Sequence, residues 1–217
     1  MQSALRPSWY RYGTVKSEDP IKEIWAIVLA AGESKRMKVP KMLLPFDGKT
    51  MIEKVIGNVI SSKVEKTIVV LGSYREEIGA VIAKYPVVSC FNENYKEGMF
   101  SSVKCGIGNL PAEAGAVLIF PGDQPFIASG VINKVIDAYR KSGKGIVIPV
   151  YRKKRGHPLL IDCKYRKVVI NSESNEGLRW LAYEFPGDVS EVRINSPGIL
   201  RDFNTKEDYL NAINQNT

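Results

Sequence analysis

The sequence contains few of the residues that build metal or redox centres. Among its 217 residues are three cysteines, Cys90, Cys105 and Cys163, and a single histidine, His157. The cysteines form no CxxC pair, which argues against a structural zinc site. Their odd number and wide separation argue against a disulfide framework as well. We therefore expect small thiols that are buried or half-buried.

Long hydrophobic runs are also missing. The longest apolar stretches, Ile24–Ala31 and Ala114–Phe120, have the length of buried strands. Both are far shorter than the roughly 20 residues that a membrane-spanning helix needs. The first residues include no apolar segment typical of a secretory signal. We therefore expect a cytoplasmic protein without a membrane partner.

Positive charge exceeds negative charge, with 31 Lys and Arg against 23 Asp and Glu and a formal net charge of +8. This balance attracts anions such as nucleic acids, acidic lipids and phosphorylated small molecules. The one dense basic cluster, residues 152–155, has no interleaved aromatic residues for stacking on single strands. No helix-turn-helix or zinc-finger signature is present. We expect no nucleic-acid partner and interpret the cluster as a solvated hairpin tip or the rim of a substrate site.

Apolar periodicity predicts strands and helices that alternate along the chain. Strands are predicted at 24–30, 66–71, 87–91, 114–120 and 145–150. Helices are predicted at 50–62, 75–83, 101–110 and 127–141. This alternation is typical of βαβ units, so the predicted fold is α/β, with a doubly wound, mostly parallel sheet.

The remaining segments are less regular. Residues 33–48 are predicted to be a long loop, and residues 151–161 a hairpin with a basic tip. A helix near 175–185, a short strand at 191–194 and a last helix at 205–213 follow. Residues 1–22 have no sustained period, so we expect an irregular N-terminal leader and a single domain from 23 to 217.

The first polar segment whose residues could bind a ligand lies at the end of the first predicted strand, where ligands of open α/β sheets bind. It spans Leu29–Met37 and is followed by Lys41. Its small residues allow the backbone to approach a phosphate, whose charge Arg36 and Lys41 would neutralise. The segment has neither the GxxxxGK[ST] nor the GxGxxG pattern. A tight turn with surface lysines is the alternative interpretation.

Two further segments carry carboxylates. Asp123 follows the predicted strand 114–120 in a turn bounded by Gly122 and Pro125, which suits coordination of Mg²⁺ but also an ordinary turn. The second segment, 202–208, contains Asp202 and Asn204. Its residues are explained by capping of the last helix, although they also permit a second metal ligand.

Together these motifs resemble a known family. LAAGxSxRM with a downstream Lys and LLP, then GDQP, RGHP and D-x-[DN]-T-x-E-D, occur in the order typical of MobA-like nucleotidyltransferases. Within this group the sequence is most similar to the MocA-type molybdenum cofactor cytidylyltransferases. The resemblance extends from about residue 24 to residue 213. It implies a Rossmann-like fold of the nucleotide-diphospho-sugar transferase type.

The resemblance also implies a reaction. An acceptor phosphate attacks the α-phosphorus of a nucleoside triphosphate and expels pyrophosphate, with Mg²⁺ as the cofactor. For the MocA type, CMP moves from CTP to a molybdopterin-type phosphate, and an acceptor molybdoenzyme is a further implied partner. Such transfer depends on positioning and charge neutralisation, so no nucleophilic Ser–His or Cys–His pair is required.

The resemblance also implies roles for the residues that match the family motifs. The implied catalytic residues are Arg36, Lys41 and Asp123. The implied nucleotide-binding residues are Leu29, Ala30, Ala31, Gly32, Ser34, Gly72, Ser101 and Ser102. Asp123 and Asn204 are the implied metal ligands, with Asp202 in place of Asn204 as the fallback. His157 is either a contact to the acceptor substrate or an ordinary structural histidine.

The sequence departs from the family pattern at two positions and leaves alternatives open. Lys38 stands where the family often has glycine, and Asn204 replaces an aspartate, which removes a charge from the metal site. The LAAG motif favours cytidylyl over guanylyl transfer, for which LAGG is typical. A guanylyltransferase, a sugar-1-phosphate nucleotidyltransferase and a non-catalytic nucleotide-binding module remain alternatives.

Overall fold

The computed structural model describes residues 23–214 except for positions 36, 38, 175 and 204. The predicted leader, residues 1–22, lies outside the described residues, as do Arg36, Lys38 and Asn204. Within the described residues, no helix is both long and apolar enough to cross a membrane.

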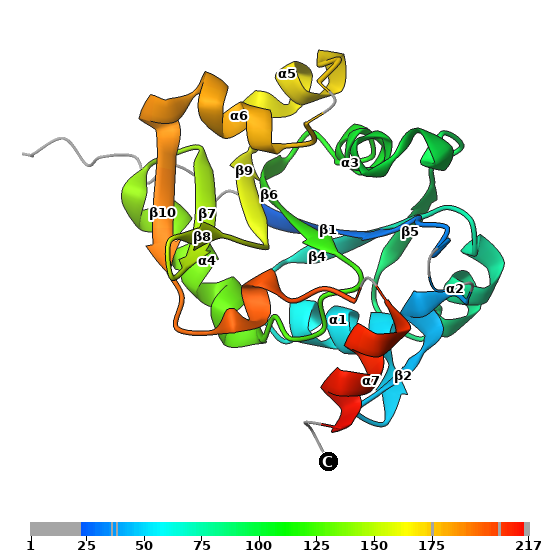
Figure 1. The fold of residues 1–217 in the computed structure, drawn as a ribbon. Helices are drawn as coiled ribbons and strands as arrows, with labels where there is room; N and C mark the ends of the chain where they lie inside the picture. Colours follow the sequence, from blue (N-terminus) through cyan, green and yellow to red (C-terminus); the bar gives the residue numbers. More distant parts are fainter. Residues whose placement is uncertain (1–22, 36, 38, 175, 204, 215–217) are drawn as a thin grey trace, which may run out of the picture.

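An eight-stranded sheet forms the centre of the molecule, with the strand order β10-β7-β9-β6-β1-β4-β5 and β8 paired to β7 (Figure 1). The strands are β1 (Glu23–Ala30), β4 (Lys66–Leu71), β5 (Val88–Phe91), β6 (Ala114–Pro121), β7 (Ile146–Tyr151), β8 (Lys154–Arg155), β9 (Leu159–Asp162) and β10 (Val189–Arg193). Within this sheet, as far as the structure describes the chain, only β8 and β9 run antiparallel to their neighbours. The predicted α/β fold with a mostly parallel sheet is therefore confirmed.

Strand β1 lies at the centre because it is apolar on both faces. It pairs in parallel with β4 on one side and β6 on the other, with Val28 level with Val69 and Phe120. Side chains alternate across a strand. Ile24 and its even-numbered neighbours therefore pack on one face, and Trp25 and the odd-numbered ones on the other.

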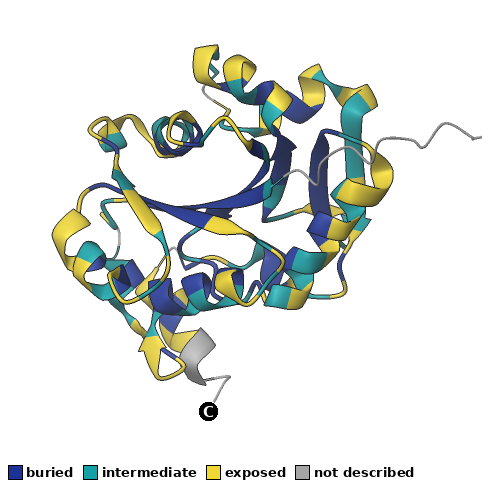
Figure 2. Ribbon diagram, turned by 180° about the vertical axis from the view of Figure 1, so that it is seen from behind, coloured by how far each residue is buried: buried dark blue, intermediate teal, exposed yellow. Residues whose placement is uncertain are grey.

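Helices cover both faces of the sheet, as Figure 1 shows. One face carries α1 (Met51–Ile60), α2 (Arg75–Ile82) and α4 (Ser129–Ser142), and the other carries α3 (Met99–Gly108), α5 (Arg166–Asn171) and α6 (Arg179–Glu184). The central strands are buried between these layers, whereas the strands at the sheet edges and the outward sides of the helices are more exposed (Figure 2). The last helix, α7 (Lys206–Asn214), packs through Tyr209 on the small antiparallel pair β2 (Pro45–Phe46) and β3 (Lys49–Thr50).

Several predictions about the irregular segments are wrong in part. The expected loop at 33–48 contains the 3₁₀ helix η1 (Lys41–Leu43) and the β2–β3 hairpin, whose turn places Asp47 and Gly48 at positive φ. The expected hairpin at 151–161 is short, because β9 inserts between β6 and β7 as a core strand. Helix α5 was not predicted, because its apolar residues are consecutive and do not mark one face: Val169 is buried, whereas Val168 and Ile170 are exposed.

Candidate functional site

The chain reverses direction across the sheet at β1. From β1 it passes to β4 and β5 on one side, and β6 then returns to the other side of β1. The loops that leave β1 and β6 therefore diverge, and such a switch point is where open α/β sheets bind ligands.

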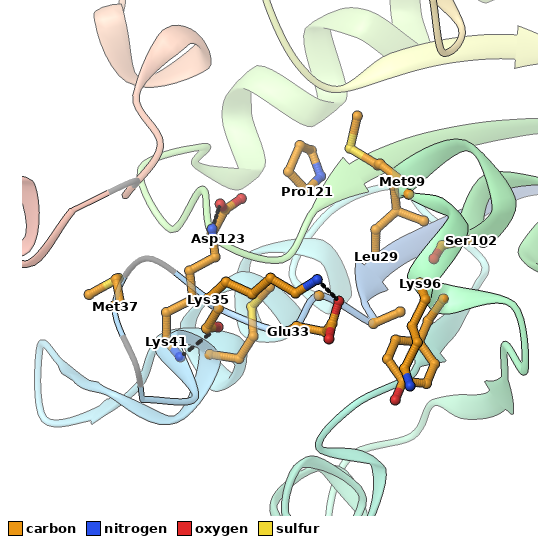
Figure 3. A pocket seen from close by; sticks show the side chains of 16 residues that line it. Leu29, Glu33, Lys35, Met37, Lys41, Lys96, Met99, Ser102, Pro121 and Asp123 are labelled. Carbon is orange, nitrogen blue, oxygen red and sulfur yellow. Dashed lines mark hydrogen bonds and ion pairs between the residues drawn. The ribbon is translucent and has the colours of Figure 1, made fainter. Parts of the chain in front are cut away.

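A cavity of about 400 Å³ opens at this switch point (Figure 3). Its walls come from the loop after β1, the start of α3 and the loop after β6, with the lining residues Leu29, Ala31, Gly32, Ser34, Lys41, Ser102 and Asp123 among them. A second cavity of about 1480 Å³ adjoins the first and shares Leu29, Gly98, Met99 and Pro121 with it. Two ligands bound in these cavities would be neighbours.

The loop after β1 is held by its own hydrogen bonds. Ser34 has a positive φ of 51°, and its Oγ accepts from the backbone N–H of Lys41 at 3.2 Å. The carbonyl of Ser34 accepts from the N–H of Met37 at 2.9 Å. The position of the Lys41 backbone is therefore fixed relative to the end of β1.

Lys41 and Asp123, which are 82 positions apart, form an ion pair at the mouth of the first cavity (Figure 3). Their side chains are only 17% and 13% exposed. The ammonium of Lys41 also donates to the carbonyl oxygen of Phe203 at 3.3 Å. Three segments predicted to carry chemistry, those after β1 and β6 and the one before α7, thus meet at one point.

Of the other predicted nucleotide-binding residues, some line a cavity and others lie behind it. Ala30 is fully buried in the core and lines neither cavity. Gly72 lies behind Ala31, so close that a Cβ there would be 2.4 Å from the Ala31 carbonyl oxygen. This contact explains the need for glycine at position 72. Ser102 lines the first cavity and Ser101 the second.

Asn92, which was not predicted, organises the start of α3. Its side chain is 5% exposed, and its amide donates to the hydroxyls of Ser101 and Ser102 at 2.9 and 3.0 Å. Its carbonyl oxygen accepts from the N–H of Asn94 at 3.1 Å. A lone asparagine one residue after β5 offers no spacing signal, so only the folded structure shows this role.

His157 lies in the second cavity, after the β7–β8 hairpin. The backbone N–H of His157 donates to the carbonyl of Ile199 at 3.0 Å, whereas its buried ring atom Nδ1 has no partner among the described residues. Burial lowers the pKa of His157, and the nearby charges of Asp123 and Asp202 oppose this only in part. Burial therefore favours the neutral imidazole, and the residue lines the second cavity.

The basic cluster at 152–155 fits both interpretations given above. Arg152 and Lys153 have positive φ values of 46° and 67°, so they form the turn between β7 and β8. Lys153 and Arg155 also line the second cavity, where Arg155 pairs with Glu191 at 2.8 Å. The cluster is a hairpin tip and a cavity rim at once.

The oxygen donors near Asp123 fit a hard cation. Among the described residues, no group of three or more His, Cys, Asp or Glu side chains is close enough to hold a metal alone. The Asp123 carboxylate and the Phe203 carbonyl face the same point, whereas Asp202 is exposed. Mg²⁺ usually takes one or two protein carboxylates and completes its shell with water and substrate phosphates. The residues therefore suit Mg²⁺ only together with a phosphorylated ligand.

The fold, with two adjoining cavities at the switch point of the sheet, places the protein in the class of open α/β proteins. Residues 26–186 match the profile of the MobA-like NTP transferase domain, and the chain belongs to this family. Its central sheet and flanking helices are also those of solved nucleotidyltransferases.

Two solved structures illustrate the shared fold. Rv0371c from Mycobacterium tuberculosis H37Rv has a TM-score of 0.79 and 22% identity, over 89% of this chain and 98% of that one. The same protein has been solved in complex with manganese. A nucleotidyl transferase from Methanothermobacter has a TM-score of 0.77 and 24% identity, over 89% and 97% of the two chains.

Curated relatives fall into three groups. The molybdenum cofactor cytidylyltransferase of Escherichia coli K12 is 25% identical over 86% of this chain and 93% of its own length. A "probable molybdenum cofactor guanylyltransferase" of Natranaerobius thermophilus is 33% identical over 58% of this chain and 59% of its own length. The bifunctional protein GlmU of Shouchella clausii is 31% identical over 55% of this chain. The matches span only 26% to 41% of the GlmU proteins.

Proposed function

We propose that the protein transfers CMP from CTP to a molybdopterin-type phosphate and releases pyrophosphate, with Mg²⁺ as cofactor. The observation that carries this proposal is the meeting of Lys41 and Asp123 in the first cavity, which adjoins the larger second cavity. The first cavity would hold the nucleotide, and the second would hold the acceptor. In-line transfer requires the two substrates to be held next to each other in this way.

The residues of the first cavity would act through charge and position. Lys41, together with Arg36, would neutralise the triphosphate, whose negative charge moves toward pyrophosphate as the α-phosphorus is attacked. Asp123 would hold Mg²⁺, with Asn204 as the second protein ligand. When bound, Mg²⁺ would neutralise charge on the phosphate oxygens. The manganese complex of M. tuberculosis Rv0371c supports a divalent cation in this fold.

The second cavity supports a large acceptor. Its volume of about 1480 Å³ exceeds the roughly 300–1,000 Å³ of ordinary small-ligand pockets. A pterin cofactor with a phosphate arm makes better use of this space than a sugar 1-phosphate. His157, which lines the second cavity, would contact the acceptor, and an acceptor molybdoenzyme would receive the product in the cytoplasm.

The base preference rests on Ala31. Its side chain lies at the end of β1, lines the first cavity and packs against Gly72. A methyl group here narrows the base site and favours the smaller pyrimidine of CTP. The similarity to the E. coli cytidylyltransferase over most of both chains points the same way.

The test is pyrophosphate release from each of the four nucleoside triphosphates with Mg²⁺. Each is paired with molybdopterin or with a hexosamine 1-phosphate as the acceptor. We expect release only with molybdopterin and fastest with CTP, and we expect Asp123→Asn to remove most of it while leaving the circular dichroism spectrum unchanged. Release with the sugar phosphate would assign the protein to the other acceptor class. Nucleotide binding without any release would identify a non-catalytic module.

A further inference from the structure

The ammonium of Lys41 occupies a position built for a cation. It is in contact with a carboxylate oxygen of Asp123 and lies 3.3 Å from the carbonyl oxygen of Phe203. Both groups are oxygen donors of the kind that Mg²⁺ and Mn²⁺ prefer. An ammonium and a metal ion cannot both lie between the same two oxygens.

The two oxygen donors differ from the lysine in how firmly they are held. Phe203 is 2% exposed, and its ring lies 5.9 Å from that of Phe46 and 5.6 Å from that of Phe126. Tyr209, 6.1 Å from the same ring, donates to the carbonyl of Pro45 at 2.6 Å. This aromatic cluster fixes the Phe203 backbone, and Asp123 is held in the turn after β6.

Lys41, by contrast, reaches the site through four flexible methylene groups from a fixed backbone. A new partner of higher negative charge can therefore draw its ammonium away, whereas the two oxygens stay where they are. A nucleoside triphosphate bound in the first cavity, which Lys41 also lines, is such a partner.

We propose that in the free protein Lys41 fills the position, between the Asp123 carboxylate and the Phe203 carbonyl, that the metal of the proposed function would take. The Phe203 carbonyl is one ligand of this site. The metal and the triphosphate displace Lys41 together, because the triphosphate takes the ammonium while the metal takes its place. This inference rests on the proposed function for the metal at Asp123 and for the identity of the nucleotide.

The exchange predicts weak metal binding in the absence of nucleotide. We would measure Mn²⁺ binding to nucleotide-free protein from the electron paramagnetic resonance signal of free Mn²⁺. Lys41→Met removes the competing charge and keeps an apolar stem of similar length. We expect this variant to bind Mn²⁺ at least tenfold more tightly than the wild type, and Lys41→Met combined with Asp123→Asn to lose the gain.

Lys35→Met provides the matched control. Lys35 belongs to the same loop and lines the same cavity, but its side chain is 75% exposed and pairs with Glu33 at 2.9 Å. Its removal lowers the net charge by the same amount and is expected to leave Mn²⁺ affinity within about twofold of the wild type. Lys41→Gln, checked by circular dichroism, serves if Lys41→Met does not fold.

Equal Mn²⁺ affinity of the wild type and both Lys41 variants would overturn the exchange, as would an equal gain in Lys35→Met. These measurements use the metal alone, so their outcome is independent of turnover. Failure of the proposed function would instead appear as absent pyrophosphate release in the wild type. The two failures can therefore be distinguished.

Discussion

At the scale of single residues, Glu53 is a buried acid with several hydrogen-bond partners. Its carboxylate accepts from the Thr50 N–H at 2.8 Å and pairs with Lys84 at 2.6 Å. The ion pair with Lys84, supported by the Thr50 hydrogen bonds, lowers the pKa of Glu53 to about 2 from the usual 4.5. Glu53 thereby ties the start of α1 to the chain after α2.

The lowered pKa predicts how stability depends on pH. A depressed carboxylate pKa contributes stability above its unfolded value, and this contribution is lost as the pH falls from about 4.5 to about 2. We expect Glu53→Gln to lower the free energy of unfolding by about 2 kcal/mol at pH 7. Urea unfolding at pH 7, 5, 4 and 3 should show the difference from the wild type shrinking below pH 4.5.

Glu113→Gln is the control for this experiment. Glu113 is exposed, and no partner for it is found in the described part of the chain. Its substitution is expected to change the free energy of unfolding by less than about 0.5 kcal/mol at every pH. A Glu53→Gln deficit that stayed constant from pH 7 to pH 3 would contradict the assigned role of the charge.

Single residues also show where sequence analysis of the site reaches its limit. Lys41 and Asp123 were predicted from motifs after two strands, because parallel strands bring their carboxyl ends to one edge. Asn92 was not predicted, since its role depends on hydroxyl groups of α3 that approach only in the folded chain. The carbonyl of Phe203 carries no signal at all, because every residue has one.

At the scale of elements, Gly106 allows α3 to pack closely on β1 and β4. A Cβ built on Gly106 would lie 2.7 Å from Cγ2 of Ile27 and 3.0 Å from Cγ2 of Val70. Those atoms belong to fully buried side chains, so they have little room to move. Glycine at this position brings the start of α3, with Ser102, close to the first cavity.

We therefore expect Gly106→Ala to destabilise the protein by about 1–3 kcal/mol, as overpacking of a core does. Gly108→Ala in the same helix is the matched variant, because a Cβ there meets nothing within 4 Å. It should be neutral or raise stability by up to about 1 kcal/mol, as alanine favours helix. Urea denaturation measures the free energy of unfolding of both variants. If Gly106→Ala is as stable as Gly108→Ala, α3 can shift away from the sheet without loss of stability, and the prediction is wrong.

At the scale of the whole molecule, the order of elements was easier to predict than their pairing. Continuous apolar runs such as Ile24–Ala30 indicate strands covered on both faces, and the helical periods between them indicate crossovers. Strand β9 carries the same apolar character but runs antiparallel between β6 and β7. Sequence position placed it in a local hairpin, because nothing in its four residues encodes the distant partner β6.

A nucleotide bound in the first cavity is expected to stabilise the whole folded molecule. The first cavity is lined by the loop after β1, the start of α3 and the loop after β6, so a ligand there bridges segments far apart in the chain. A ligand that binds only the folded state stabilises it by about 2.7 kcal/mol at one hundred times its dissociation constant. For a protein of this size, that corresponds to roughly 5–10 °C in melting temperature.

We expect CTP with Mg²⁺ to raise the melting temperature more than GTP with Mg²⁺ at the same concentration, as measured by scanning fluorimetry. Ala31→Gly should reduce this difference in melting temperature, because the methyl group of Ala31 narrows the cavity beside Gly72. A single methyl group contributes about 1–3 kcal/mol to such discrimination, so a partial shift toward GTP is expected. Ala112→Gly, at an exposed position outside both cavities, should leave the ratio unchanged. If Ala31→Gly behaves like this control, nucleotide selectivity resides in other residues of the first cavity.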